Sequence, residues 1–198
     1  MKESNHRFLL IFFLFLILFN CTKQKPDNAF EVLIFEIDSL KIAEPYISAE
    51  LGIMFNPPRD WQPVSRNIVD ELGNSAIEVT EDSLNISVEQ IFLNLSNSSF
   101  IFLSSFPEID RFELAYNNLR DLMTGKISSQ ELKIGSFEHN NLKFYQFINT
   151  SANKVALKLI AESKSGSVFM FDYIMPYSVY RDNLKAIESS IGTIKNAN

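Results

Sequence analysis

The 198-residue sequence is poor in the residue types that build most catalytic and metal sites. It holds two histidines and one cysteine, Cys21, so no intramolecular disulfide can form. His6 lies among the first ten residues, which leaves His139 as the only histidine of the remaining chain, in a polar turn. One imidazole cannot supply a multi-histidine site, and we predict neither a metal nor a cofactor.

Glycine is also scarce, and the six glycines are widely scattered. No glycine-rich phosphate loop, GxSxG elbow or EF-hand loop occurs. Residues 151–154 match the SxxK pattern, but the companion KTG is absent and the position is typical of a strand connection. The carboxylates Glu108, Asp110 and Glu113 cluster at a predicted helix start, where they favour the helix dipole. We therefore predict no catalytic residue, and we expect the chain not to be an enzyme.

Positive charge is limited too, with 18 lysines and arginines against 24 aspartates and glutamates, a formal net charge of −6. Loss of a leader that contains Lys2, Glu3 and Arg7 makes the remaining chain more negative by one unit. An acidic chain does not bind phosphate backbones through a basic face. We predict no nucleic-acid partner.

Against these absences stands a long hydrophobic run near the N terminus. Lys2 and Arg7 precede an uninterrupted apolar stretch over residues 8–19, in the order of the charged and apolar regions of a secretory signal. A helix of that length reaches only about 18 Å, whereas the hydrocarbon of a bilayer is ~30 Å thick. We predict that residues 1–20 are a cleaved signal peptide. The alternative is an uncleaved signal anchor with an ordinary thiol at Cys21.

The sequence Leu18-Phe19-Asn20-Cys21 resembles a bacterial lipobox, although Asn20 stands where the usual pattern has Gly, Ala or Ser. The resemblance implies that Cys21 carries lipid, and stable anchoring requires more than one acyl chain. Residues 21–28 are polar, cannot bury a core and are predicted to be a flexible tether. Thr22 replaces the Asp that retains lipoproteins at the inner membrane, which favours the outer membrane of the envelope.

Residues 29–198 are long enough for a single α+β domain with a sizeable core. Residues 30–42 are apolar without a clear period, so a strand and a short helix both stay open. Alternating apolar residues predict a strand over 47–55, which Asn56-Pro57-Pro58 ends. A meander of four strands is predicted near residues 131–138, 142–149, 154–162 and 167–175. Its last strand is apolar on both faces and belongs in the middle of a covered sheet.

Three helices are predicted from capping residues and spacing. The first covers 65–72, with Ser65 as cap, Gly73 at its end and Ile68, Val69 and Leu72 buried. The second starts at Asp110, which with Glu113 forms a capping box, ends at Gly125 and buries Phe112, Ala115, Leu119, Leu122 and Met123. The third runs from Ser178 to Ile194 with an apolar stripe of Tyr180, Leu184, Ile187, Ile191 and Ile194.

Two stretches resemble PsbP-like proteins. Residues 51–61, LGIMFNPPRDW, look like the opening strand, proline and tryptophan of that superfamily, which includes many bacterial lipoproteins. Residues 171–180, FDYIMPYSVY, look like its closing strand, proline and amphipathic helix. The resemblance implies an α/β/α sandwich with a central antiparallel sheet and a protein that docks to other proteins. It carries over no catalytic residue.

We therefore predict a monomeric lipoprotein, held at the envelope membrane through Cys21, that binds an unknown envelope protein or assists assembly. The alternatives are a tethered binder of a small or apolar ligand, in a cleft between helix and sheet, and a hydrolase that uses carboxylates or the pair of Ser151 and Lys154. Trp61 follows a proline turn and is either a core anchor or an exposed binding residue at a rim. Asp172 lies in an apolar strand and needs a partner where it is buried.

Overall fold

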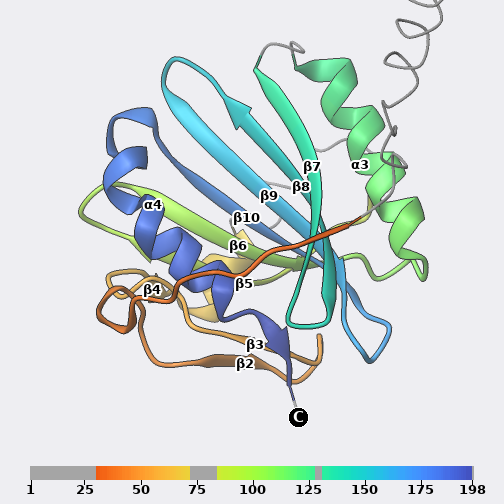
Figure 1. Cartoon of the computed structure of the whole chain (residues 1–198), viewed down its shortest axis with the longest axis horizontal. Coiled ribbons are helices and arrows are strands. Elements are labelled where there is room, and N and C mark those ends of the chain that lie inside the picture. Colours follow the sequence, from red (N-terminus) through yellow and green to blue (C-terminus); the bar gives the residue numbers. More distant parts are fainter. Residues whose placement is uncertain (1–29, 72–83, 128–130, 198) are drawn as a thin grey trace, which may run out of the picture.

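The structure is a computed structural model that describes residues 30–71, 84–127 and 131–197 (Figure 1). These residues form a mixed α+β fold with one large sheet, one small sheet and few helices. The predicted signal peptide, residues 1–20, and the tether with Cys21, residues 21–28, lie outside the described residues. Within the described part of the chain, no helix is both long enough and apolar enough to cross a membrane.

The large sheet contains eight strands in the order β1-β7-β8-β9-β10-β6-β5-β4. Every neighbouring pair is antiparallel except β1 and β7, which are parallel. The predicted meander is confirmed, with each strand end within one residue of its expected position. Its strands are β7 (Leu132–His139), β8 (Leu142–Thr150), β9 (Lys154–Glu162) and β10 (Val168–Pro176). β10 lies between β9 and β6, inside the sheet, as its two apolar faces indicate.

The sequence did not predict the hairpin of β5 (Ser87–Asn94) and β6 (Ser99–Ser105), which extends the sheet beyond β10. In β5 the pairing register shifts between Val88 and Gln90. Such a bulge interrupts the period-two alternation that identifies a strand in a sequence. Both edges of the sheet are strands of two residues, β1 (Glu31–Val32) and β4 (Gln62–Pro63).

The predicted single strand over 47–55 is wrong, because the chain forms a hairpin there. β2 (Tyr46–Ser48) and β3 (Ile53–Phe55) pair in the small sheet, whose third strand is β11 (Lys195–Asn196). Gly52, with φ of +65°, turns the chain in a left-handed conformation that glycine adopts readily. Leu51, Ile53 and Phe55 are buried, so the alternation indicated the core face correctly.

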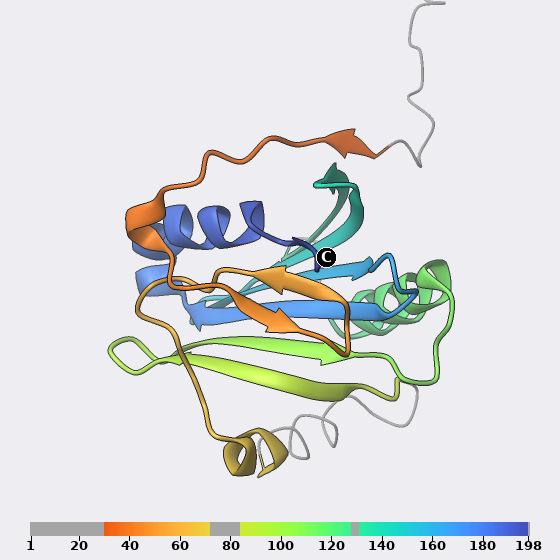
Figure 2. The same cartoon turned by 90° about the horizontal axis from the view of Figure 1, so that it is seen from below.

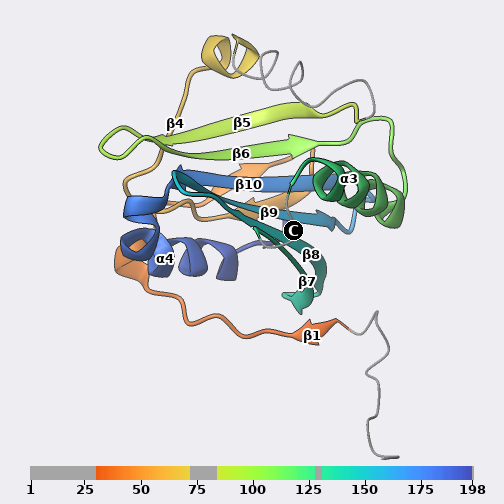
Figure 3. The same ribbon diagram turned by 90° about the horizontal axis from the view of Figure 1, so that it is seen from above.

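Residues 30–42 are neither a continuous strand nor an α-helix. They contain β1, an extended stretch and the one-turn 3-10 helix η1 (Ser39–Lys41). This segment, residues 31–41, is called the strap below. It runs along the outer side of the C-terminal helix α4 (Tyr177–Gly192), as Figures 2 and 3 show.

The second predicted helix is α3 (Phe112–Lys126), and its predicted ends are wrong. Arg111 occupies the N-cap position without a side-chain hydrogen bond, so Asp110 does not cap the helix. The helix continues through Gly125 and ends one residue later. Its predicted apolar face is confirmed for Phe112, Ala115, Leu119 and Met123, which are buried, while Leu122 is half-buried.

The other two helices differ from prediction in detail. Residues 66–71 are helical, with Val69 buried but Ile68 43% exposed, and the predicted end at Leu72 and Gly73 lies outside the described residues. Helix α4 ends at Gly192, two residues before the predicted end. Burial varies along its apolar stripe, because Ile187 and Ile191 are buried whereas Tyr180 and Leu184 are half-buried. Ile194 is buried just beyond the end of the helix.

Alternate residues of β10 belong to two separate apolar cores. Phe169, Phe171 and Tyr173 pack in the first core, which also contains Trp61, residues of the small sheet and Ile187 and Ile191 of α4. Val168 and Met170 pack in the second core with the buried residues of α3. We call these the α4 face and the α3 face of the large sheet. Val69 of the helical residues 66–71 packs separately, on Val88 and Ile91 of β5.

Candidate functional site

Trp61 is the residue that the sequence offered as a core anchor or a rim residue. Its side chain is 1% exposed, and its ring lies 6.3 Å from that of Tyr173 in the first core. A side chain buried to this degree is not presented to a partner, so Trp61 is a core residue. Tyr173 is fully buried beside it, and burial raises the pKa of its phenol far above the ordinary value.

The Ser151 and Lys154 pair forms a turn and not a nucleophilic site. The Lys154 amide donates to Ser151 Oγ at 3.3 Å, and the Ser151 amide donates to the Lys154 carbonyl at 2.9 Å. The hydroxyl therefore closes the connection between β8 and β9, as the position of the SxxK match indicated.

His139 also has a structural role, because both of its ring nitrogens contact backbone carbonyl oxygens. Its Nδ1 lies 2.9 Å from the Leu33 carbonyl oxygen and its Nε2 lies 2.9 Å from the Gly192 carbonyl oxygen. The ring thus joins the end of β7 to the strap and to the end of α4. Across the described ranges of the chain, no cluster of three or more His, Cys, Asp or Glu residues could hold a metal ion.

An ion pair lies in the middle of the α3 face. Asp172 of β10 is paired across the sheet with Lys158 of β9, and Lys158 Nζ donates to Asp172 Oδ2. Only 9% of the Asp172 side chain and 19% of the Lys158 side chain are exposed. The expectation that a buried Asp172 needs a partner is confirmed, and the partner is a charge in an otherwise apolar row.

A cleft of about 420 Å³ lies over this ion pair, between α3 and the sheet. Its volume falls in the range of ~300–1,000 Å³ that is typical of small-molecule sites. Leu119, Leu122 and Met123 of α3 form one wall, and Ile86, just before β5, and Val88 of β5 form part of the lining from the sheet side. The rest of the lining comes from the sheet and from the residues after α3, and includes Phe102, Ser104, Asn149, Met170, Asp172 and Ile174.

Two buried oxygens in the cleft, Asp172 Oδ1 and Asn149 Oδ1, accept no hydrogen bond from any residue that the structure describes. A buried acceptor without a partner costs roughly 1–3 kcal/mol. Asp172 and Asn149 both line the cleft, together with Lys126, Lys154 and Lys158, so part of the cleft wall is polar while most of the remainder is apolar. The arrangement can bind an apolar molecule with a hydrogen-bond donor, and it contains no activated nucleophile.

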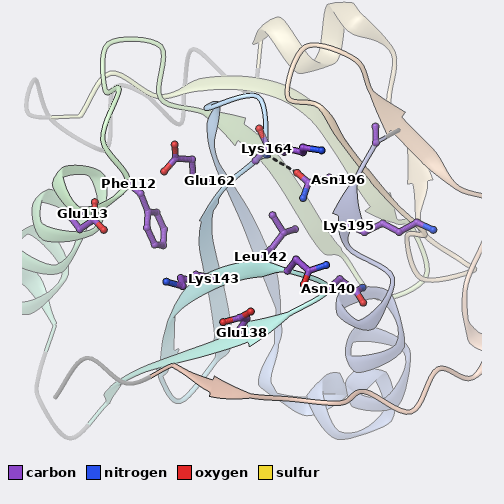
Figure 4. A pocket seen from close by; sticks show the side chains of 13 residues that line it. Phe112, Glu113, Glu138, Asn140, Leu142, Lys143, Glu162, Lys164, Lys195 and Asn196 are labelled. Carbon is purple, nitrogen blue, oxygen red and sulfur yellow. Dashed lines mark hydrogen bonds between the residues drawn. The ribbon is translucent and has the colours of Figure 1, made fainter. Parts of the chain in front are cut away.

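A second, more open concavity of about 1000 Å³ lies at the ends of the β7–β8 and β9–β10 hairpins (Figure 4). Its charged residues are of both signs, Glu113, Glu138 and Glu162 with Lys143, Lys164 and Lys195. The Lys164 amide donates to Asn196 Oδ1 at 2.7 Å, the bond drawn dashed in Figure 4. This surface suits polar contacts with another macromolecule rather than the enclosure of a small one.

Asp172 was apparent from the sequence, and a cleft between helix and sheet was a general expectation, but Lys158 and Asn149 were not identified. One signal could have identified Lys158. Both charges lie seven residues from Ser165 at the middle of the β9–β10 turn, so a hairpin register places them opposite each other. The cleft has no comparable signal, because its lining comes from five strands and one helix.

No family model matches the sequence, and no curated protein matches it. Among solved structures, the chain is similar to the solution structure of cyanobacterial PsbP (CyanoP) from Synechocystis sp. PCC 6803. The TM-score is 0.48 and the sequence identity 12%, over 81% of this chain and 97% of that chain.

Proposed function

We propose that this chain is the precursor of a lipid-anchored, non-catalytic binding protein of the bacterial envelope, built on the α/β/α sandwich of the PsbP-like proteins. Its cleft between α3 and the sheet binds a small apolar ligand that carries a hydroxyl or amino group. Cys21 carries the lipid, residues 1–20 are the signal peptide that directs export, and the outer membrane is the favoured location. The mature protein acts as a monomer.

The observation that supports the ligand is a largely apolar cleft whose lining includes two residues, Asp172 and Asn149, each with a buried oxygen that has no partner among the described residues. An apolar ligand body gains about 25 cal/mol for each Å² of surface that it removes from water. A donor on the ligand additionally satisfies Asp172 Oδ1, whose cost is already present in the empty protein. Lys158 holds the carboxylate in place, so the acceptor is preorganised.

The ligand proposal is tested with N-phenyl-1-naphthylamine, an apolar fluorescent amine, and the mature chain carrying Cys21→Ser to avoid detergent. We expect a saturable increase in dye fluorescence. Leu122→Trp places a bulky ring at the half-buried wall of the cleft and should abolish it. Leu114→Trp is the matched control, because Leu114 is also on α3, is 38% exposed and does not line the cleft. Equal binding by both variants would contradict the proposed site.

The anchor is tested separately in a bacterial host. Cys21→Ser removes the only cysteine, and we expect metabolic incorporation of a fatty-acid label and flotation with membranes to be lost together. The tether offers two lysines, Lys23 and Lys25, which attract lipid too weakly to hold the chain. A Ser variant that still floats with membranes would show that the protein is not held by acylation.

A second candidate function is docking to an envelope protein, which the mixed-charge concavity of Figure 4 favours. Opposite charges interspersed on one surface give specificity to polar interfaces. A photo-crosslinker at Lys164, which is exposed on the β9–β10 turn, should then capture one defined protein in the native envelope. The same crosslinker at Leu95, an exposed residue outside the concavity, is the control.

A further inference from the structure

The strap presents an unusual row of exposed apolar side chains. Ile34 is 93% exposed, Val32 and Leu40 are each 70% exposed, and Ile37 is 47% exposed. Contiguous exposed apolar surface on a soluble domain marks a site of contact with another molecule or with a membrane. Figures 2 and 3 place this segment at the outermost side of the molecule, beyond α4.

These side chains are exposed although the strap backbone is fixed to the domain. The Leu33 amide donates to the Glu138 carbonyl at 2.9 Å, and the Asp38 amide donates to Ser189 Oγ at 3.0 Å. Between these bonds, Phe35 packs edge-on against Phe137, with ring centroids 5.8 Å apart. The strap therefore uses its backbone and one aromatic ring to hold the domain, and leaves its aliphatic residues outside.

Close packing at Gly192 shows how tightly the strap is seated. A Cβ atom added to Gly192 would lie 2.6 Å from the Phe35 Cβ, a separation that real side chains do not reach. Glycine at the end of α4 is thus required for the strap to lie where it does. The Ile34 side chain is therefore exposed even though the segment that carries it is packed against the domain.

The position of the strap in the sequence identifies what covers it. Phe30 lies nine residues after Cys21, so an extended chain between them spans at most about 30 Å. A lipid on Cys21 therefore keeps the N-terminal end of the strap within about this distance of a bilayer. Exposed Val, Ile and Leu side chains gain free energy at the boundary between head groups and acyl chains.

We propose that the strap lies on the lipid surface that carries the Cys21 anchor, with Val32, Ile34, Ile37 and Leu40 at the acyl boundary. This inference rests on the acylation of Cys21 in the proposed function. The charges of the strap specify the surface further. The strap carries Glu31, Glu36 and Asp38 against Lys41, and Lys185 pairs with Glu36. Because the chain as a whole is acidic, this surface fits a zwitterionic leaflet better than an anionic one.

The experiment uses the acylated mature protein on phosphatidylcholine vesicles, with an environment-sensitive nitrobenzoxadiazole label at Ile34→Cys. Acylation blocks Cys21, the only natural cysteine, so the introduced thiol is the single labelling site. We expect a blue-shifted emission and quenching by lipids that carry a shallow spin label. Leu95→Cys, at a position 83% exposed on the β5–β6 turn, is the matched control and should give the emission of a label in water.

Flotation of the same vesicles separates the two proposals. Protein that fails to float shows that the anchor is wrong, and the strap inference fails with it. Protein that floats with a water-exposed label at position 34 overturns the strap inference alone. A label that is water-exposed on vesicles but shielded in native envelopes also overturns it, because a protein then covers the strap. Vesicles enriched in phosphatidylglycerol should reduce the blue shift.

Two glycine variants test whether the docked geometry is needed. Gly192→Ala forces Phe35 away from α4 and should abolish the lipid signal at position 34 without changing flotation. Gly135→Ala is the control, because a Cβ on Gly135 meets nothing within 4 Å. If Gly192→Ala keeps the full lipid signal, the strap reaches the membrane as a loose chain and the proposed surface is wrong.

Discussion

The two faces of the large sheet are built from alternate residues of the same strands, yet they are filled differently. On the α4 face, β10 contributes Phe169, Phe171 and Tyr173, each with no exposed surface, to a closed core. On the α3 face, the same strand contributes Met170, Asp172 and Ile174 to the lining of a cleft. One strand thus supplies both the most buried aromatic residues and part of the polar wall of the cleft.

Polar groups are divided unequally between the two faces. The α4 face contains one buried hydroxyl on β10, that of Tyr173, which lies 3.2 Å from Ser190 Oγ. The α3 face contains an ion pair and, among the described residues, two oxygens without a protein partner. The buried Ser99 hydroxyl, on the same side of β6 as Ile101 and Leu103 of the first core, also has no partner among the described residues, so the contrast between the faces lies in the ion pair and the cleft.

The largest effect should come from a cavity on the α4 face. Ile187→Ala removes a side chain that is 1% exposed, and such truncations typically cost ~2–5 kcal/mol. Leu122→Ala on the half-buried wall of the cleft should cost clearly less. Urea unfolding of the three proteins measures both changes. If both variants lose the same free energy of unfolding, the two faces do not differ in packing.

Lys185→Ala is a further control for the same experiment. Lys185 contacts Glu36 with Nζ 2.9 Å from Oε2, but 91% of the Glu36 side chain is exposed. Exposed ion pairs contribute ~0–1 kcal/mol, so this variant should unfold almost as the wild type does.

An intermediate effect is expected from the ion pair of the α3 face. Asp172→Leu leaves the Lys158 ammonium largely buried without its partner, and should cost roughly 1–3 kcal/mol. The double variant Lys158→Met, Asp172→Leu should recover stability, because apolar residues replace a buried pair at little cost.

Stability and dye binding should therefore separate in the double variant, which folds well but lacks the acceptor. A double variant less stable than Asp172→Leu, or one that binds N-phenyl-1-naphthylamine as the wild type does, would contradict the role assigned to the pair.

The smallest effect should appear only in alkali. Burial raises the pKa of Tyr173, so the folded protein keeps the phenol protonated where the unfolded chain ionises it. This contribution to stability is complete below the unfolded pKa of about 10 and is lost as the pH rises above it, at up to ~1.4 kcal/mol per pH unit. In urea unfolding, the free energy of unfolding of Tyr173→Phe should fall less steeply with rising pH than that of the wild type. Tyr145→Phe, on the less buried α3 face, should change this pH dependence less. If the free energy of unfolding falls equally steeply with pH in the wild type and in Tyr173→Phe, the role assigned to the buried phenol is wrong.

Elements with a regular apolar pattern were predictable from the sequence, and elements without one were not. The meander and the core residues of α4 were predictable because apolar residues repeat with the period of each element. The β5–β6 hairpin was missed because a bulge at Val88 and Gln90 breaks that period. At α3 the sequence offered Asp110 as a cap, but the helix starts after Arg111 with no side-chain cap.

The cleft was beyond prediction for a different reason. Asn149, Ser104 and Val88 acquire a common role only when β8, β6 and β5 take their places in the sheet. The suggestion of an apolar cleft between helix and sheet was general. Of its lining residues, Leu119, Leu122 and Met123 had been named as a helix face and Lys154 and Asp172 for other reasons, but nothing in the sequence brought them together. Local patterns indicate which residues are buried, whereas a site depends on which strands are neighbours.

The two short edge strands of the large sheet have a consequence for crowding. Proteins that share a membrane surface move in two dimensions and meet edge to edge far more often than free proteins do. Open strand edges are templates for pairing with another copy. Here one edge ends in Gln62 and Pro63, and proline has no amide to donate. The other ends in Glu31 and Val32 of the strap. Each edge strand offers only two residues to a neighbour and covers two residues of β7 or β5, so it blocks pairing with another copy at that part of the edge.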